Sequence, residues 1–206
     1  MRLELDLTKD NKNLFFSSDF HAGHTNILKY DGRPFRNVGE MHLAIENGWN
    51  ETVKDNDIVI YLGDLLFSRG QYKEYVEGML YRLNGTIHFV MGNHDRLDEI
   101  KSFNRFESIQ DYLEVRVSHM QDSGGGLKKV ETIFCSMHYP LYSWNQMGRG
   151  SITCHGHCHG NLHHGEDASY YVNRRAIDVG CMLHDYKPIS YLSIIYKLKD
   201  IKPEIH

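Results

Sequence analysis

The stretch Ile58-Val59-Ile60-Tyr61-Leu62-Gly63-Asp64 contains the pattern from which the fold of this chain can be inferred. A short apolar run, rich in β-branched and aromatic side chains, is typical of a β-strand. Glycine and aspartate follow at its end, where strands turn into loops. The run therefore predicts a core strand that carries Asp64 at its carboxyl end.

The same pattern occurs four more times, each time as an apolar run followed by side chains that can bind a metal ion. The further pairs are Leu14–Phe16 with Asp19 and His21, Ile87–Met91 with Asn93, Ile133–Met137 with His138, and Ile152–His155 with His157 and His159. A single pair of this kind carries little information. Five in order place oxygen and nitrogen ligands at the ends of successive strands, which indicates a dinuclear metal site.

Such a site needs this mixture of residue types. Two neighbouring cations require a carboxylate that can bridge them, with imidazoles and amide oxygens in the remaining positions. Paired metal ions can then stabilise both the attacking and the leaving oxygen of a phosphoryl displacement. Imidazole together with carboxylate suits Zn, Fe, Mn and Co, whereas Ca²⁺ prefers oxygen ligands alone.

Length and composition predict one ordinary globular domain over residues 1–206. The chain is 41% hydrophobic and 24% charged, which separates it from disordered proteins. No stretch approaches the roughly 20 apolar residues of a membrane span. The first ten residues alternate polar and apolar side chains, which predicts a strand and not a signal peptide. A cytoplasmic protein without a membrane partner is expected.

Charge and cysteine content narrow the function classes further. A net charge of −4 and a pI near 6.4 argue against nucleic acid as a partner, so a nuclease is a minor alternative. Four cysteines without C-x-x-C spacing predict a reduced, intracellular protein. Cys154, His155, His157 and Cys158 could form a structural zinc site. Strand alternation, however, would put Cys154 and His155 on opposite faces, which disfavours it.

The remaining pattern predicts helices first and hairpins later. Helices are expected over 38–53, 71–83 and 99–103, a β-hairpin over 113–117 and 130–134, and strands over 151–155, 174–179 and 190–196. This order suggests an α/β or α+β protein. Two mixed β-sheets would pack face to face, with the helices outside.

Taken together, the five motifs resemble those of the calcineurin-like metallophosphoesterases. The motifs are Asp19-Phe20-His21, Gly63-Asp64, Gly92-Asn93-His94-Asp95, His138 before Tyr139-Pro140, and Gly156-His157-Cys158-His159. Each motif is weak alone, but the ordered set is specific, and the likeness to small stand-alone bacterial and phage members covers nearly the whole chain. It implies a four-layer αββα sandwich with the metals at one sheet edge.

The resemblance also implies a ligand set for two divalent ions. Asp19, His21, Asp64 and His159 would hold one ion, and Asp64, Asn93, His138 and His157 the other, with Asp64 bridging. Mn²⁺ is the expected ion, and Fe, Zn, Ni and Co are alternatives. Asp and Asn also favour turns without any metal. That simpler interpretation does not explain why a histidine or glycine accompanies each of them.

His94 and Asp95 are the candidate catalytic residues. The resemblance implies that His94 lies over the metals and helps to protonate the leaving oxygen, while Asp95 holds its other ring nitrogen. The alternative is that the pair only stabilises a turn. The nucleophile would be water or hydroxide, so no protein nucleophile is required.

The candidate substrate-binding residues are His24, Arg33, Arg36 and Arg69, since guanidinium groups match phosphate. Any of them could instead be an ordinary surface residue. A small phosphomonoester or phosphodiester, with a nucleotide as one candidate, is the expected substrate. The stretch 63–70 is similar to one in serine/threonine protein phosphatases but is one residue too long, which makes that activity the lesser alternative. A metal-binding scaffold without turnover is the non-enzymatic alternative.

Overall fold

The apolar runs that precede Asp19, Asp64 and Asn93 form neighbouring strands of one sheet. β2 (Leu14–Ser17), β3 (Ile58–Tyr61) and β4 (Thr86–Val90) pair in parallel in that order. β5 (Ser108–Gln110) pairs in parallel with β4, and β10 (Ile189–Ser190) runs antiparallel to β2 at the other edge. Because β2, β3 and β4 are parallel, the three segments that follow them lie at the same edge of this first sheet.

The second sheet is built around a long hairpin. β6 (Tyr112–Asp122) and β7 (Leu127–Met137) pair antiparallel along their full length, which confirms the predicted hairpin and extends it. β8 (Ile152–His155) and β9 (Ala176–Asp178) continue the sheet in parallel beside β7. β1 (Arg2–Asp6) pairs in parallel with β6 at the far edge. Both sheets are therefore mixed, as predicted.

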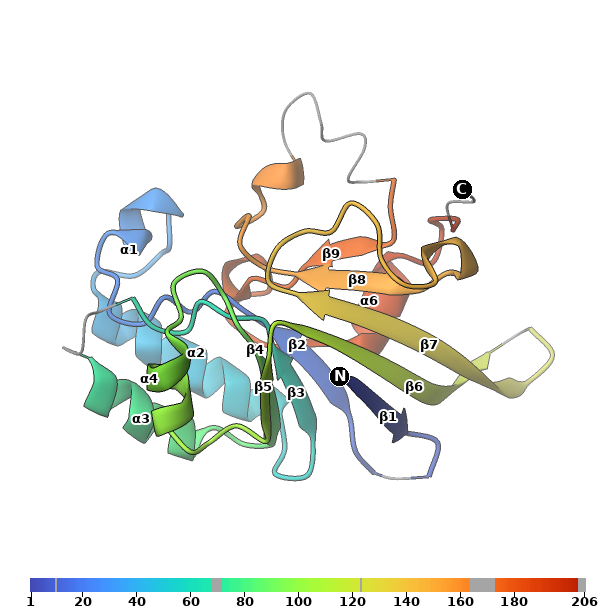
Figure 1. Ribbon diagram of the computed structural model, residues 1–206, viewed down its shortest axis with the longest axis horizontal. Coiled ribbons are helices and arrows are strands. Elements are labelled where there is room, and N and C mark those ends of the chain that lie inside the picture. Colours follow the sequence, from blue (N-terminus) through green and yellow to red (C-terminus); the bar gives the residue numbers. More distant parts are fainter. Residues whose placement is uncertain (10, 68–71, 123, 164–172, 204–206) are drawn as a thin grey trace.

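The computed structural model describes residues 1–9, 11–67, 72–122, 124–163 and 173–203, and Figure 1 shows its two sheets packed face to face. Alternate residues of each strand form the core between them. Phe16 of β2 meets Phe134 of β7 with 5.1 Å between ring centroids. The predicted two-sheet sandwich is confirmed. Among the described residues, no helix is long and apolar enough to span a membrane.

Helices cover the other face of the first sheet. They are α2 (Val38–Thr52), α3 (Lys73–Arg82) and the short α4 (Leu97–Ser102), close to the predicted positions (Figure 1). The side chain of Asn37 caps α2 by accepting the backbone N–H of Glu40. Ile45 and Trp49 of this helix are buried in the same cluster as Phe15 and Val59 of the sheet. Helix spacing and strand alternation thus produce one shared core.

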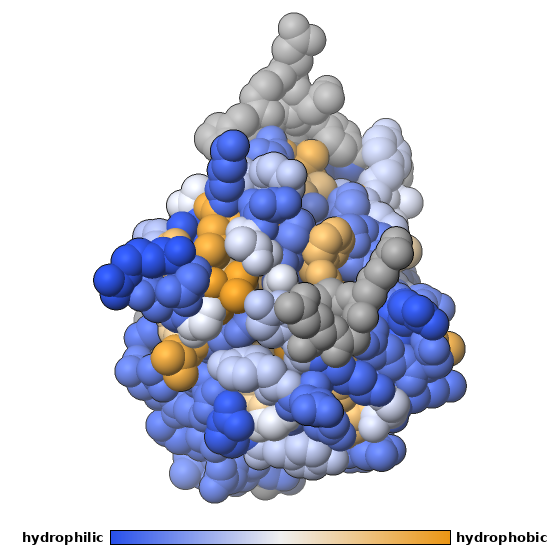
Figure 2. Space-filling view, turned by 90° about the vertical axis from the view of Figure 1, so that its left-hand side faces the viewer, coloured by the Kyte–Doolittle hydropathy of each residue, from blue (hydrophilic) through white to orange (hydrophobic). Residues whose placement is uncertain are grey.

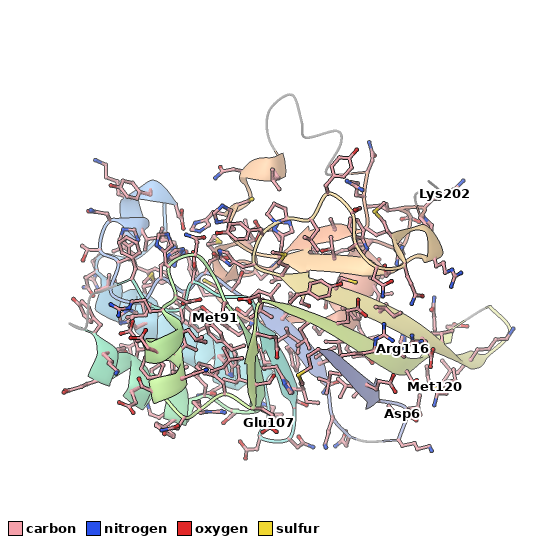
Figure 3. All side chains as sticks on the ribbon, in the orientation of Figure 1. Asp6, Met91, Glu107, Arg116, Met120 and Lys202 are labelled. Carbon is pink, nitrogen blue, oxygen red and sulfur yellow. The ribbon has the colours of Figure 1, made fainter. Side chains whose placement is uncertain are left out.

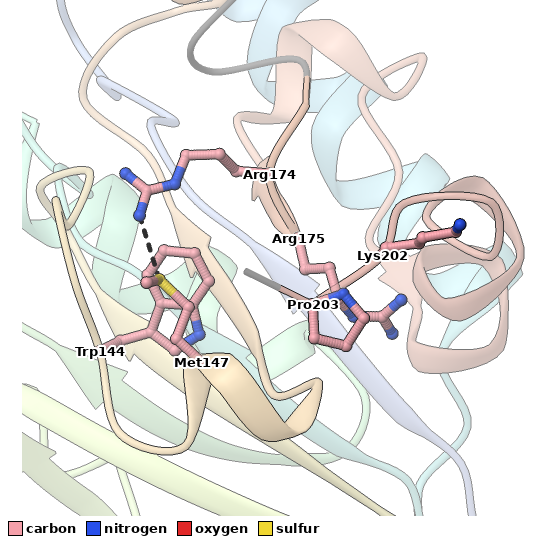
Figure 4. Close-up of a pocket in the computed structure, with 6 residues that line it drawn as sticks. All are labelled: Trp144, Met147, Arg174, Arg175, Lys202 and Pro203. Carbon is pink, nitrogen blue, oxygen red and sulfur yellow. Dashed lines mark hydrogen bonds between the residues drawn. The ribbon is translucent and has the colours of Figure 1, made fainter. Parts of the chain in front are cut away.

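The outer face of the second sheet has a thinner cover. Ile133 and Cys135 of β7 pack against Trp144 and Met147, the latter in the short 3-10 helix η1 (Met147–Arg149). Figure 4 shows the neighbouring pocket, where the guanidinium of Arg174 donates a hydrogen bond of 3.0 Å to Met147 Sδ and lies 5.1 Å from the Trp144 ring. In the described part of the chain, the fourth layer is therefore a loop with a short helix.

The prediction of a strand over 190–196 is wrong. Only Ile189–Ser190 is extended, and α6 (Tyr191–Lys197) follows. Ser190 caps this helix by accepting the N–H of Ser193, and Tyr191, Ile194 and Leu198 recur at helical spacing as its buried side. The pair Ile194-Ile195 favoured a strand locally, but the cap and the spacing of the buried residues determine a helix.

Candidate metal centre

The candidate donors come from five loops at one end of the sandwich, above the ends of β2, β3, β4, β7 and β8 (Figure 1). Figure 3 labels Met91, which follows β4 and leads directly into the donor loop of residues 92–95. The loops after β2 and β3 remain paired beyond the strands. The N–H of Asp19 donates to the carbonyl of Gly63, and that of His21 to the carbonyl of Asp64, both at 3.0 Å. Backbone hydrogen bonds thus fix these two donor loops relative to each other.

The donor loops have an unusual backbone conformation. Five of the seven candidate donors, namely Asp19, His21, Asp64, His157 and His159, have φ between 49° and 67°. Non-glycine residues rarely adopt this left-handed conformation, and clusters of them occur at functional sites. The neighbouring glycines are required for space, because a Cβ at Gly92 would overlap the Asp64 carboxylate and one at Gly156 the Asp19 carboxylate.

Asp19, His21 and His159 form a buried donor set. Oδ1 of Asp19 lies 3.8 Å from Nε2 of His21 and 3.5 Å from Nε2 of His159. The two ring nitrogens are themselves 3.1 Å apart. Asp19 and His21 are almost fully buried. Their donor atoms face one another across a space in which a metal ion could be held.

Asn93, His138 and His157 form an outer donor set. Oδ1 of Asn93 lies 2.9 Å from Nε2 of His138 and 2.8 Å from Nδ1 of His157. His138 is buried, whereas Asn93 and His157 are exposed. Nδ1 of His138 donates a hydrogen bond to the carbonyl of Leu62 at 2.7 Å. The other ring nitrogen, Nε2, is therefore the atom that can bind a metal ion.

Asp64 connects the two sets. Its Oδ2 lies 3.6 Å from Nε2 of His21 in the buried set and 3.4 Å from Nε2 of His138 in the outer set. Burial raises the pKa of this carboxyl group, but the hydrogen bond and charge of His138 outweigh it and lower the pKa to about 2. Asp64 is therefore an anion that faces both sets. Burial lowers the pKa of His21 to about 3, so that its ring is neutral and available as a ligand.

A buried ion pair supports the buried set from behind. Nδ1 of His159 lies 2.8 Å from both carboxylate oxygens of Asp31, which in turn pairs with Arg33 at 2.9 Å. Burial opposes protonation of His159, but the hydrogen bonds and charges of Asp19 and Asp31 outweigh it and raise its pKa to about 10. A carboxylate on the distal nitrogen orients a ligating imidazole and increases its basicity.

Arg33 does not reach the donor cluster as a substrate-binding residue would. Its guanidinium is buried and donates to the carbonyls of Asp19 and Phe20 at 2.9 Å each, as well as to Asp31. Arg36 is 89% exposed at its side chain and pairs with Glu40 on α2. Arg69 lies outside the described residues. His24 lies beside the buried set, with its ring 5.9 Å from that of His21, and stacks on Phe67 with 3.8 Å between centroids.

His94 lies beside both sets, and its ring forms one further group with His21 and Asp64 whose ligand atoms lie within 4.8 Å of one another. Its Nε2 is 3.9 Å from Oδ2 of Asp64, and its side chain is 38% exposed. The expectation that Asp95 holds the other ring nitrogen is not met. The Asp95 carboxylate instead accepts the backbone N–H groups of Asp64, Leu65 and Gly92 at 2.8–3.0 Å. Burial raises the pKa of Asp95 to about 6 against these hydrogen bonds. Asp95 ties two donor loops together.

The donor chemistry fits divalent metal ions. Carboxylate oxygens and imidazole nitrogens converge within 4.8 Å in three overlapping groups, and Asp19, His21 and Asp64 each belong to two of them. The third member is His159, His94 or His138. All such groups in the described part of the chain consist of aspartate and histidine. Cys154 is buried in the core between the sheets and belongs to none of them, nor does Cys158, so the structural zinc alternative is not supported.

Comparisons with known proteins agree with this site. The sequence model described as calcineurin-like phosphoesterase matches residues 13–190. An uncharacterized protein of Methanocaldococcus jannaschii is 36% identical over 187 residues, covering 91% of each chain. The Gene 66 protein of Mycobacterium phage D29 is 28% identical, covering 86% of this chain and 92% of its own.

A solved structure shares the fold. A protein of unknown function from Aquifex aeolicus superimposes with a TM-score of 0.64 at 22% identity, covering 90% of this chain and 99% of its own. The family match spans most of the chain, including all five donor loops. The chain belongs to the calcineurin-like phosphoesterase family.

Proposed function

We propose that this protein is a phosphoesterase that depends on two divalent metal ions and hydrolyses a small phosphate ester with water. The observation that supports this best is the position of Asp64. One of its oxygens faces a histidine of the buried set at 3.6 Å and a histidine of the outer set at 3.4 Å. A carboxylate shared in this way is what two adjacent cations require.

The residues of the chain would act as follows. Asp19, His21, His159 and Asp64 would hold one ion, and Asp64, Asn93, His138 and His157 the other. Bound there, the ions would lower the pKa of a water molecule and stabilise negative charge on the phosphoryl oxygens. His94 would donate a proton to the leaving oxygen, because its ring is exposed and adjacent to Asp64. Asp95 would keep the loops of Asp64 and His94 in register through its backbone hydrogen bonds.

The charge around the donors favours a phosphodiester over a phosphomonoester. A monoester carries up to two negative charges at neutral pH and a diester only one. Among the described residues, neither Arg33 nor Arg36 offers its guanidinium to this site, and the nearest groups are histidine and aromatic rings.

Turnover assays with added Mn²⁺ test this proposal. Bis-p-nitrophenyl phosphate should be hydrolysed faster than p-nitrophenyl phosphate, and EDTA should abolish both reactions. Fe, Co, Ni and Zn would be compared under the same conditions. Undiminished activity in EDTA, with less than one metal per chain by elemental analysis, would exclude the metal mechanism. Metal binding without turnover of any ester would favour the scaffold.

The His94→Ala variant tests the proton donor. We expect unchanged metal content and a kcat lower by about 10²–10⁴-fold for esters with alkyl or ribose leaving groups. The loss should be much smaller for p-nitrophenolate, which needs little protonation. Equal losses for all leaving groups would contradict a role as acid and would leave His94 as an electrostatic stabiliser.

A further inference from the structure

An aromatic surface lies beside the candidate proton donor. The ring of Phe67 is 4.7 Å from that of His94 at 74°, and it stacks on the ring of His24 at 3.8 Å and 26°. Tyr30, at the end of the short helix α1 (Ile27–Tyr30), lies 6.0 Å beyond His24. We call the pair of Phe67 and His24 the aromatic shelf. It brings together side chains from two separate loops at the edge of the donor cluster.

The position of the shelf is fixed by the backbone. Ala22 donates to the carbonyl of Leu65 at 2.9 Å, and Phe67 donates to the carbonyl of Ala22 at 3.0 Å. These bonds continue the pairing that aligns Asp19 with Gly63 and His21 with Asp64. The N–H of His24 also donates to the carbonyl of His21 at 3.0 Å. The shelf is thus built on the same paired loops as the donors.

The shelf is open to solvent although it is aromatic. Phe67 is 39% exposed, next to an edge of the site that carries imidazole rings. In Figure 2, which views the molecule from the side of α1 to α4, the surface is mainly blue and the orange areas are separate. Exposed apolar groups that adjoin a cluster of polar ligands are typical of a binding site.

We propose that the aromatic shelf binds a planar aromatic ring carried by the leaving group of the phosphate ester. This inference rests on the proposed function, because it takes the phosphoryl group to lie over the donors. A leaving oxygen within reach of His94 places its substituent next to Phe67, whose ring is 4.7 Å away. Aromatic rings stack favourably on such a platform and tolerate different substituents. Phe67 and His24 would then determine specificity without taking part in the chemistry.

Binding of two phosphonates to the Mn²⁺-loaded protein tests the shelf without turnover. Phenylphosphonate and cyclohexylphosphonate carry the same anionic group and rings of similar size, but only one ring is aromatic. Isothermal titration calorimetry should give a Kd about two- to tenfold lower for phenylphosphonate, the usual gain from an aromatic pair beyond its buried area. Phe67→Leu should reduce the ratio of the two Kd values, cyclohexylphosphonate over phenylphosphonate, to about one. Phe67→Trp should retain the wild-type ratio.

Two further variants separate stacking from other effects. His24→Phe should keep the ratio, because a stacked ring still supports Phe67, whereas His24→Ala should lower it. Tyr139→Leu is the matched control, since Tyr139 is similarly exposed but lies against His157, 4.7 Å away, in the outer set. Its ratio should stay at the wild-type value.

The outcomes distinguish this inference from the proposed function. Equal affinities in the wild type, or a preference that survives Phe67→Leu, would overturn the shelf even if esters are hydrolysed. The shelf would also be overturned if Tyr139→Leu abolished the difference in Kd between the two phosphonates, or if the protein bound neither phosphonate. A preference for phenylphosphonate that depends on Phe67, in a protein that hydrolyses no ester, would support the shelf and overturn the proposed function.

Discussion

The buried and outer donor sets share Asp64 but differ in charge, burial and support. The buried set contains the carboxylate of Asp19 and is backed by a second carboxylate, Asp31, behind His159. The outer set contains the neutral amide of Asn93, and its buried histidine, His138, is backed by a backbone carbonyl. Since the affinity of a site for a divalent ion rises with the number of anionic ligands, the buried set should bind its ion more tightly.

The largest effect on metal binding and turnover is expected from a change in Asp64, the residue that both sets share. Asp64→Asn should empty both positions and lower kcat by about 10³-fold or more, because it removes the charge that faces both ions. Asp19→Asn should weaken only the buried position. Elemental analysis and turnover of bis-p-nitrophenyl phosphate measure the two effects, with the exposed Asp200→Asn as control. Two metals and normal rates in both variants would disprove the bridging role of Asp64.

A smaller effect is expected from the carboxylate behind His159. Asp31→Asn should weaken the buried position by about 10–100-fold, the usual worth of a carboxylate that orients a ligating histidine. The outer position should keep its affinity. Co²⁺ titrations followed by visible absorption can resolve the two positions. Arg36→Gln, which removes an exposed ion pair near the same loop, is the control. Equal weakening of both positions would remove the proposed distinction between the sets.

The smallest effect concerns the scaffold beneath the buried set. His42 of α2 is buried and accepts the N–H of Gly23, in the loop that carries His21. Burial lowers the pKa of His42 from 6.5 to about 4. As pH falls through this interval, the unfolded chain takes up a proton that the folded chain does not, so folding stability is lost. The loss is on the order of 2–3 kcal/mol, and stability above pH 6.5 is unaffected.

Urea unfolding of the metal-free protein in EDTA at pH 8 and pH 4.5 measures this effect. His42→Gln keeps a hydrogen-bond acceptor but has no titratable group, so its stability should fall less between the two pH values than that of the wild type. An identical fall in both proteins would show that His42 does not contribute. The result separates the pH dependence of the scaffold from that of the donors.

The positions of the donors could be predicted because they depend on strand order alone. Apolar runs followed by Asp64 or His138 become strands of the two sheets whose ends meet at one end of the sandwich, and the structure brings all seven candidates together. Whether they hold metal ions stays a prediction. Arg33, Asp31 and Asp95 could not be placed in this way, because their partners are backbone groups and rings of loops whose path no sequence periodicity encodes.

The C-terminal helix and the aromatic shelf are two further features that local sequence patterns could not predict. The Ile194-Ile195 pair favoured a strand, but the Ser190 cap and the contact of Ile194 with the core between the sheets select a helix. Phe67 gave no signal of its own, because the run Leu65-Leu66-Phe67 after Asp64 resembles the continuation of any strand. Its place beside His24 depends on the pairing of two loops that are far apart in the sequence.

The pairing of β1 with β6 has a consequence for the order in which the chain can assemble. Arg2 of β1 lies opposite Glu114 of β6. During synthesis β1 therefore cannot pair until more than half of the chain has been made. β2, β3 and β4, by contrast, can pair as each is synthesised. Contacts of long sequence separation form late because loop closure costs entropy before they contribute. Asp19, Asp64 and Asn93 can therefore gather early, while the donor histidines that follow β7 and β8 arrive last and complete the site.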